Sequence, residues 1–372
     1  MHTSSPPLLC VGDYEAYAKD KLPSMVENYF KAGSSLEQTV QDNSLVYRRY
    51  RFRPRVLRDV SKRDMSTTVL GSPVSCPVGV APMSICRMAH LDGEMGIAKA
   101  CERLQLPFGL STVSTFSIED IAVGAPNSVR WFQLYIFKER SLTETLVRRA
   151  EAAGFSALVL TVDAPVAGRR LSSMREGFTV PGHLRLPNID ASDGIFKSLR
   201  TDAANVPYLE VVGSQLDPSI TWEGVKWLLN FTRLPVIVKG VLNAEDAREA
   251  VSHGVSAIWV SNHGGRQLDG VPASLDVLAE IVDAVGDRCE VYLDGGVRSG
   301  YDVIKAIAIG ARAVFIGRPA LWGLVHKGTE GVVNLLQLVK DEVDNAMALL
   351  GVANLDELNR SHVTHESLLP KL

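Results

Sequence analysis

The segment A-I-W-V-S-N-H-G-G-R-Q (257–267) passes from an apolar run directly into a polar, glycine-containing stretch. The same pattern recurs in V-Y-L-D-G-G-V (291–297) and A-V-F-I-G-R-P (313–319). Each run is almost continuously apolar rather than alternating, which is typical of parallel strands covered on both faces. These segments therefore predict buried strands whose carboxyl ends carry polar loops.

Five similar runs precede them along the chain: P-V-G-V-A-P-M (77–83), P-F-G-L-S-T (107–112), R-W-F-Q-L-Y (130–135), A-L-V-L-T-V-D (157–163) and P-V-I-V-K-G-V (235–241). Apolar residues at helical spacing lie between several runs, over 142–153, 244–252 and 299–308, each ending near a glycine. Strand–helix units repeated in this way predict a (β/α)8 barrel, or TIM barrel, which needs about 250 residues. A doubly wound open sheet is the alternative, but the number of units and the late glycine motifs favour the barrel.

The chain of 372 residues exceeds what a barrel needs. We expect one domain over 1–372, with the surplus in an N-terminal extension (1–70) and an insert after the fourth strand (171–230). The extension looks helical and is expected to plug or flank the bottom of the barrel. The insert contains P-G-H-L-R-L-P-N-I-D-A-S-D-G, which is too loop-like for a domain and makes it a candidate lid.

Composition narrows the class of protein. Apolar residues make up 46% and charged residues 22%, as in a globular protein with a sizeable core. The 39 Lys and Arg nearly balance 42 Asp and Glu, which argues against a nucleic-acid partner. No apolar run reaches the roughly 18–20 residues of a membrane span, and the N-terminal M-H-T-S-S-P-P-L-L does not resemble a signal peptide.

The 5 cysteines are scattered and form no C-x-x-C pair, so neither a disulfide framework nor a zinc site is predicted, and we expect no metal. A reducing compartment is the simplest interpretation. The C-terminal Pro370-Lys371-Leu372 approximates the S-K-L peroxisomal address. We therefore expect a peroxisomal protein, with the cytoplasm as the alternative.

Active sites of such barrels form at the carboxyl ends of the strands. That rule selects polar residues that interrupt or follow the apolar runs: Gln133, Tyr135, Thr161, Asp163, Lys239, Ser261, His263, Asp294 and Arg318.

The last two strand ends read D-G-G-V-R (294–298) and I-G-R-P (316–319). Glycines let backbone N–H groups approach an anion and Arg adds a two-pronged donor, so both loops together indicate a phosphate-bearing ligand. The alternative is that the glycines serve tight turns and the arginines a solvated rim.

Histidine has an unperturbed pKa near neutrality, so a residue such as His263 is suited to taking a proton from a substrate. Arg266 could hold a carboxylate, and Asp163 could orient the imidazole. Lys239 could form a Schiff base, place positive charge against a cofactor, or simply reach water. By default Arg170 is a solvated cation and Tyr29 a core aromatic.

Several motifs in order resemble one known family: K-L-P-S-M-V-E-N-Y-F, F-Q-L-Y, L-T-V-D-A-P-V-A-G-R-R, V-K-G-V, S-N-H-G-G-R-Q-L-D, L-D-G-G-V-R and I-G-R-P. Together they resemble the FMN-dependent L-2-hydroxy acid oxidases, which include glycolate oxidase, lactate oxidase and flavocytochrome b2. The resemblance extends over about 13–362.

The resemblance implies FMN as cofactor and a role for each matching residue. His263 would be the base oriented by Asp163, and Arg170 and Arg266 would clamp the substrate carboxylate beside Tyr29 and Tyr135. Lys239 would also act in catalysis, beside the flavin N1–C2 carbonyl. The implied cofactor-binding residues are Ala81, Pro82, Met83, Ser111, Gln133, Thr161, Lys239, Ser261, Asp294, Gly295, Gly296, Arg298, Gly317 and Arg318.

The implied reaction converts a 2-hydroxy acid to the 2-keto acid and reduces O2 to hydrogen peroxide. Two positions depart from the glycolate oxidases: Val113 stands for Trp in the substrate pocket, and Met83 for Thr beside the flavin. Because losing an indole opens space, we expect medium-chain or aromatic acids to be preferred over glycolate.

Three alternatives to an oxidase are compatible with the sequence. The first is a dehydrogenase of the same family that passes electrons to a quinone or cytochrome, and the second is a lactate monooxygenase. The third is a non-catalytic flavin-binding protein, which would be free to lose the catalytic set that this chain retains. A homotetramer or octamer is expected from the resemblance alone, with no membrane partner.

Overall fold

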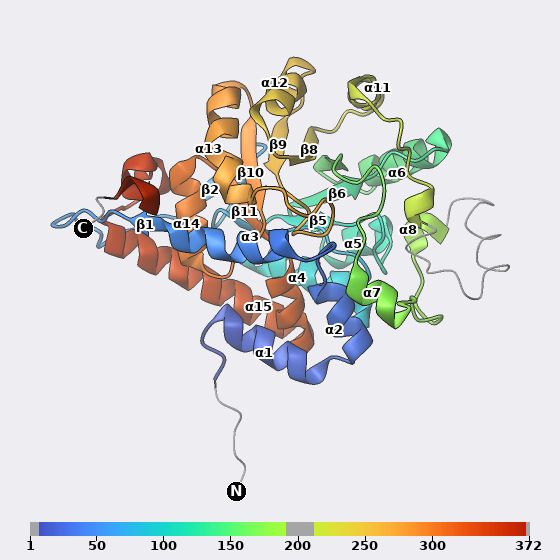
Figure 1. Ribbon diagram of the computed structural model, residues 1–372, viewed down its shortest axis with the longest axis horizontal. Coiled ribbons are helices and arrows are strands. Elements are labelled where there is room, and N and C mark those ends of the chain that lie inside the picture. Colours follow the sequence, from blue (N-terminus) through green and yellow to red (C-terminus); the bar gives the residue numbers. More distant parts are fainter. Residues whose placement is uncertain (1–6, 191–211, 370–372) are drawn as a thin grey trace, which may run out of the picture.

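Eight parallel strands close into a barrel in the computed structural model, which describes residues 7–190 and 212–369 (Figure 1). Each strand pairs with the next along the chain, and the last pairs with the first, Val314 opposite Val78. This closure confirms the TIM barrel and excludes the open sheet. The strands are β4 (Val78–Val80), β5 (Phe108–Leu110), β6 (Arg130–Leu134), β7 (Ala157–Thr161), β8 (Val236–Val241), β9 (Ala257–Val260), β10 (Glu290–Asp294) and β11 (Ala313–Ile316).

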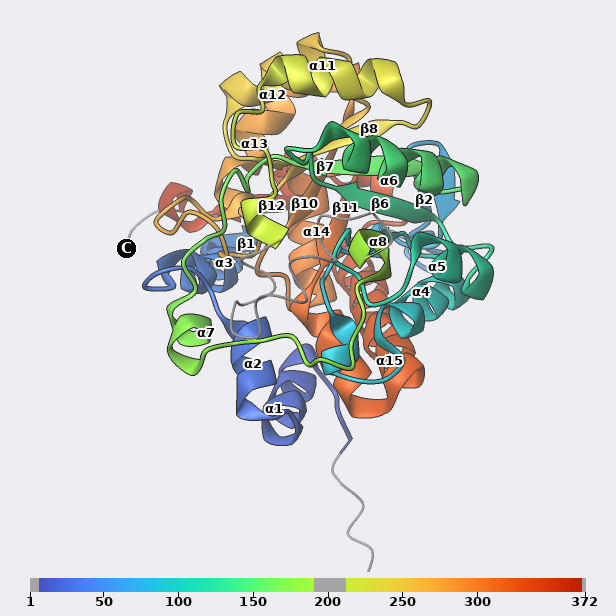
Figure 2. The ribbon, with the colours of Figure 1, turned by 90° about the vertical axis from the view of Figure 1, so that its right-hand side faces the viewer.

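A helix follows each strand and covers the outside of the barrel. Figure 2 shows α4, α5, α6 and α11 following one another around it. The predicted helix over 244–252 has the observed bounds of α12, where the Asn243 side chain accepts from the Asp246 N–H at 2.7 Å. The ring consists of α4 (Gly93–Leu104), α5 (Ile118–Gly124), α6 (Arg140–Ala152), α11 (Trp222–Phe231), α12 (Ala244–Ser252), α13 (Ser274–Val285), α14 (Gly300–Ile309) and α15 (Arg318–Leu350).

The interior of the barrel is a packed aromatic core. Trp131, Trp259, Tyr292 and Phe315 come from β6, β9, β10 and β11 and are all fully buried. The Trp259 and Phe315 ring centroids lie 4.0 Å apart. Because side chains fill the barrel, its interior is a floor beneath the carboxyl ends of the strands rather than a channel.

A hairpin closes the bottom of this core. It consists of β2 (Thr67–Val69) and β3 (Ser72–Val74), and its Val69 and Val74 pack against the aromatic core. The Leu70 N–H donates to the Glu290 carboxylate, at the amino end of β10, at 3.2 Å. Only this last part of the N-terminal extension lies at the bottom.

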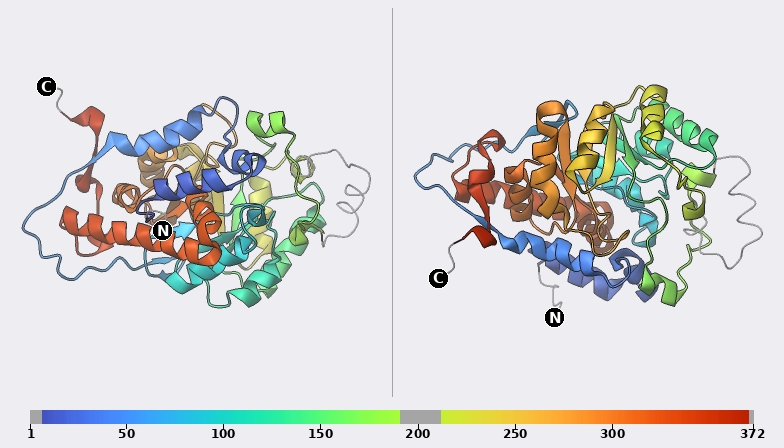
Figure 3. Two further views of the ribbon diagram at one scale, coloured as in Figure 1. Left: turned by 90° about the horizontal axis from the view of Figure 1, so that it is seen from below. Right: turned by 45° about the horizontal axis from the view of Figure 1, so that its top comes forward.

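The helical part of the extension covers the opposite face, so the predicted position at the barrel bottom is wrong for it. The Tyr47 hydroxyl of α3 donates to the Gly295 carbonyl, just past the carboxyl end of β10, at 2.9 Å. Figure 3 shows these helices beside α15, against which α1 packs. They are α1 (Val11–Lys21), α2 (Ser24–Lys31) and α3 (Gln38–Arg49), and β1 (Tyr50–Phe52) then pairs with β12 (Val363–His365).

The insert after β7 is shorter than predicted, because α11 at its end is the ring helix of the fourth unit. Its described part contains α7 (Leu171–Glu176) and α8 (Pro187–Asp190), while 191–211 and the predicted address at 370–372 lie outside the described residues. Five short 3-10 helices complete the elements: η1 (Cys86–Met88), η2 (Gly286–Arg288), η3 (Leu355–Glu357), η4 (Arg360–His362) and η5 (Glu366–Leu368). Within the described ranges, none of the helices is both long enough and apolar enough for a bilayer crossing.

The aromatic core yields a stability prediction. Phe315→Ala should lower the free energy of unfolding by about 3–5 kcal/mol, because it removes a fully buried ring and leaves a cavity among rigid neighbours. Urea unfolding followed by circular dichroism measures the change, with the 81% exposed Val123→Ala as control. A loss no larger than that of the control would contradict the packed-core interpretation.

Candidate active site

A cavity at the carboxyl ends of the strands gathers nearly all of the predicted site residues. Asp163 and Ser261 are the two predicted residues outside its lining: Asp163 lies behind His263, and Ser261 behind Lys239. Lining residues that the sequence did not single out include Phe30, Ser84, Ala164, Ala167, Val212, Leu216 and Leu321.

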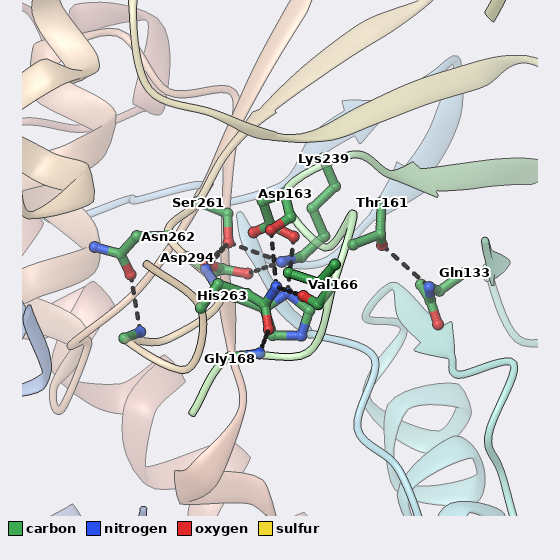
Figure 4. Close-up of polar contacts among 12 residues, drawn as sticks. Gln133, Thr161, Asp163, Val166, Gly168, Lys239, Ser261, Asn262, His263 and Asp294 are labelled. Carbon is green, nitrogen blue, oxygen red and sulfur yellow. Dashed lines mark hydrogen bonds and ion pairs between the residues drawn. The ribbon is translucent and has the colours of Figure 1, made fainter. Parts of the chain in front are cut away.

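His263 follows β9 in an unusual backbone conformation. Its φ of +59° lies in the left-handed region, as do those of Gly264 (+64°) and Gly265 (+75°). A left-handed conformation is strained for a residue with a β-carbon. The turn brings His263 Nδ1 to 2.9 Å from Asp163 Oδ1 (Figure 4).

The Asp163 carboxylate determines how the imidazole can act. Burial alone would raise the pKa of this carboxyl, but His263 and Lys239 outweigh it and hold the pKa below its usual value. An ionised carboxylate can only accept hydrogen bonds, so Nδ1 carries the proton and Nε2 is left able to accept one. Gly240 makes room for Asp163, because a β-carbon at Gly240 would lie 2.6 Å from that of Asp163.

Lys239, Ser261 and Asp294 form a buried network on neighbouring strands (Figure 4). Lys239 Nζ lies 2.7 Å from Ser261 Oγ and 3.0 Å from Asp294 Oδ2, and Ser261 donates to Asp294 Oδ1 at 2.6 Å. An ammonium carries three protons, so one remains for a ligand. The contacts with Ser261 and Asp294 hold the lysine nitrogen within this network, which disfavours a Schiff base.

Arg298 and Arg318 place positive charge at the ends of β10 and β11. Arg318 is held by backbone oxygens, with Nε 3.0 Å from the Phe30 carbonyl and Nη1 3.0 Å from that of Gly264. Burial lowers the pKa of Arg318 to about 10, and the neighbouring Arg298 adds to this shift. The nearby carboxylates are Glu15, which forms an ion pair with Arg298 Nε at 4.0 Å, Asp302, which acts on Arg298, and Glu37, which acts on Arg318.

The backbone around these arginines also suits an anion. Arg318 opens the long helix α15, whose amino end carries free N–H groups and a partial positive charge. Gly296, at φ +76°, has no room for a side chain, because a β-carbon there would lie 1.7 Å from the Asn43 carbonyl oxygen. Buried cations with few carboxylate partners, beside glycines and a helix amino end, fit a phosphorylated cofactor.

A chain of small polar groups lines the wall formed by β5, β6 and β7. Gln133 connects them, since its Nε2 donates to Thr161 Oγ1 at 3.1 Å and its Oε1 accepts from Ser111 Oγ at 3.4 Å. Ser84 Oγ lies 3.2 Å from Ser111 Oγ and extends this series of hydrogen-bonded groups. Such donors and acceptors fit the polar edge of a heteroaromatic ring.

Arg266, Arg170, Tyr29 and Tyr135 all line the cavity on the side of His263. Arg266 lies over the Tyr29 ring, 5.3 Å from its centroid, and burial lowers the pKa of this guanidinium, with Arg170 adding repulsion. Burial also raises the pKa of the Tyr135 phenol, so the phenol stays a proton donor. Two guanidinium groups and the hydroxyls of two tyrosines in one pocket are suited to binding a carboxylate.

Some residues that support the site gave no recognisable signal in the sequence. The side-chain amides of Asn43 and Asn262 bond reciprocally, each at 2.8 Å, and join α3 to the loop of His263. Glu94 is buried and accepts from the backbone N–H groups of Cys86 at 2.9 Å and Thr115 at 3.1 Å. These contacts join distant segments, so no local pattern announces them.

The chain is similar to known proteins over most of its length. The model of the FMN-dependent dehydrogenase family matches residues 18–365. The chain is 46% identical to 2-hydroxyacid oxidase 1 of Homo sapiens, over 98% of both chains, and 46% identical to glycolate oxidase 1 of Zea mays, over 96% of both.

Solved structures of similar proteins include mandelate-oxidising enzymes. Mandelate oxidase with (S)-4-hydroxymandelic acid is 38% identical, with a TM-score of 0.89 over 96% of this chain and 98% of the other. A soluble mutant of the membrane-associated (S)-mandelate dehydrogenase from Pseudomonas putida is 35% identical, with a TM-score of 0.89 over 97% of this chain and all of the other. Matches of this extent show that the chain belongs to the FMN-dependent dehydrogenase family.

Proposed function

We propose that this FMN-dependent enzyme is an (S)-2-hydroxy acid oxidase that prefers medium-chain or aromatic acids and passes electrons to O2. The observation that carries the proposal is the imidazole of His263, held at 2.9 Å by Asp163 in the same cavity as the cationic side chains that suit a carboxylate. The proposal assigns the base, the carboxylate site and the cofactor site to neighbouring parts of one cavity.

Arg298, Arg318 and Gly317 would hold the phosphate of FMN, with Asp294 on its sugar-alcohol chain. Lys239 would use its remaining proton at the N1–C2 carbonyl edge, and the chain through Gln133 would meet the rest of the ring. When bound, FMN supplies a two-electron acceptor. The protein then contributes binding, orientation and electrostatics.

The substrate carboxylate would bind between Arg170 and Arg266, with Tyr135 and Tyr29 beside the 2-hydroxyl. This placement directs the substrate toward His263 Nε2, which accepts the proton that leaves as the acid becomes a 2-keto acid. Asp163 stabilises the resulting imidazolium, because its carboxylate lies in direct contact with Nδ1.

The apolar wall of the cavity supports a substrate larger than glycolate. Met83, Val113, Val212, Leu216 and Leu321 all line it. Of these, Val113 stands where the glycolate oxidases carry Trp, so its short side chain leaves more space. A medium alkyl chain or a phenyl ring could fill that space and bury apolar surface.

Oxygen as the acceptor is supported by the names of two relatives, 2-hydroxyacid oxidase 1 and glycolate oxidase 1, which are oxidases at 46% identity. The named dehydrogenase is 35% identical. A quinone or cytochrome acceptor is the second candidate. A peroxisomal location stays a prediction that suits peroxide as product.

An anaerobic titration followed by admission of air tests the proposal. (S)-Mandelate or 2-hydroxyoctanoate should bleach the flavin absorbance, and air should restore it rapidly with one hydrogen peroxide per acid oxidised. His263→Gln should retain FMN but bleach about 10²–10⁴-fold more slowly, because it lacks the base. Absorbance and peroxide assays provide both readouts.

His365→Gln, on β12, is the matched control and should behave as wild type. Bleaching without rapid recovery in air would indicate another acceptor. Full activity of His263→Gln would contradict the assigned base, and a flavoprotein that no 2-hydroxy acid bleaches would support the non-catalytic alternative.

The pocket wall yields a specificity prediction. Val113→Trp should shift the ratio of kcat/KM toward glycolate and against 2-hydroxyoctanoate and mandelate, by about 10–200-fold, because an indole would fill the space that a long side chain needs. Steady-state kinetics on the three acids measures the shift, with the exposed Val123→Trp as control. An unchanged ratio would mean that Val113 does not limit the pocket.

A further inference from the structure

Gln267 ends the S-N-H-G-G-R-Q segment and has no part in the function assigned above. Only 9% of it is exposed, and its side-chain amide is fully used. Nε2 donates to the carbonyls of Asp163 and Val166, each at 2.9 Å, and Oε1 accepts from the Gly168 N–H at 3.0 Å. Figure 4 shows Asp163, Val166 and Gly168 beside His263.

These three bonds join the loop after β7 to the loop after β9. The first loop carries Asp163 and continues to Arg170, and the second carries His263 and Arg266. Each loop therefore supplies one partner of the imidazole–carboxylate pair and one of the two arginines. The relative position of the two loops therefore determines the distance between Asp163 and His263 and also that between Arg170 and Arg266.

The loops also touch backbone to backbone beside this amide. A β-carbon at Gly168 would lie 2.2 Å from the Arg266 carbonyl oxygen, so no side chain fits between the two loops. A second tie runs through the extension, where the Ser34 N–H donates to the Gly265 carbonyl and the Ser35 N–H to that of Arg169, each at 2.8 Å. Gln267 makes the direct polar link at the end nearer to Asp163.

We propose that Gln267 is a positioning residue, which fixes the register of Asp163 with His263 and of Arg170 with Arg266. The inference rests on the proposed function, since it assumes that these residues act on a 2-hydroxy acid. Removing the amide would leave two carbonyls and one N–H without their partner, and the loop after β7 would shift to regain them. A displacement of about 1 Å at reacting groups can cost about 100-fold in rate.

Gln267→Met tests the proposal, because it keeps the length of the side chain and removes every hydrogen bond. We expect kcat/KM to fall on the order of 100-fold, with a lower kcat as well as weaker binding of oxalate, read from its perturbation of the flavin absorbance. FMN content should stay at the wild-type level, because the hydrogen bonds of the Gln267 side chain go to Asp163, Val166 and Gly168 and not to residues assigned to FMN. Amide hydrogen exchange should become faster at Gly168, which needs no turnover to be observed.

Gln337→Met is the matched control, since Gln337 is exposed on α15 and its side chain donates to Asp341 Oδ1 at 2.7 Å, outside the lining of the active-site cavity. Gln267→Glu separates positioning from packing: it keeps volume and the acceptor for Gly168 but cannot donate to the Asp163 and Val166 carbonyls. It should therefore be at least as impaired as Gln267→Met. Should Gln267→Met fail to fold, Gln267→Glu with the same readouts serves in its place.

Unchanged kcat/KM and oxalate binding in Gln267→Met would overturn the proposal. So would a loss of activity that only parallels loss of FMN or of thermal stability, because Gln267 would then be a purely structural residue. Failure of the proposed function would look different: the wild type itself would oxidise no 2-hydroxy acid, while the exchange at Gly168 would still report the link between the loops.

Discussion

The arrangement of this molecule depends on positive charge buried at one end of the barrel with little carboxylate to neutralise it. Arg266 and Arg318 are both directed toward the end of α2, where they bond to the carbonyls of Tyr29, Phe30 and Ala32. Removing a guanidinium from water is costly unless its protons find acceptors. The last turn of a helix supplies such acceptors, because its carbonyls have no partners within the helix.

This constraint explains why the N-terminal extension belongs to the site rather than to the bottom of the barrel. Where α2 packs on these arginines, its carbonyls accept hydrogen bonds from Arg266 and Arg318. The same packing brings Tyr29 into the cavity. The remaining positive charge faces inward, where it suits the phosphate of the cofactor and the carboxylate of the substrate. Lys239 differs, because it already has a carboxylate partner, Asp294, at 3.0 Å.

The barrel itself could be predicted from sequence because its signals are local. Each strand is an apolar run, and some ring helices have caps and glycines that can be recognised, as α12 has at Asn243 and Gly254. The residues expected at strand ends do gather in one cavity, because parallel strands align their carboxyl ends. Roles for Tyr29 and Arg170 came from the family resemblance, since composition alone made them a core aromatic and a solvated cation.

What could not be predicted depends on contacts between distant segments. The position of the extension follows from bonds such as Arg266 to the Tyr29 carbonyl, across 237 positions in sequence. The wrong boundary of the insert arose because α11 follows a long loop rather than a strand. Asn43 and Glu94 bond to partners on other elements, so their types and spacing carry no recognisable pattern. Gln267 ends a motif that the sequence shows, but its bonds to the loop after β7 could not be predicted from that motif.

The central claim is that the buried arginines at the ends of β10 and β11 form a phosphate site. Its most direct test compares the affinity of the cofactor-free protein for FMN and for riboflavin, which lacks only the phosphate, by titration of flavin fluorescence. Hydrogen bonds to charged groups contribute about 1.5–3 kcal/mol each, so two of them predict that FMN binds at least about 100-fold more tightly. Equal affinity for the two flavins would contradict the account.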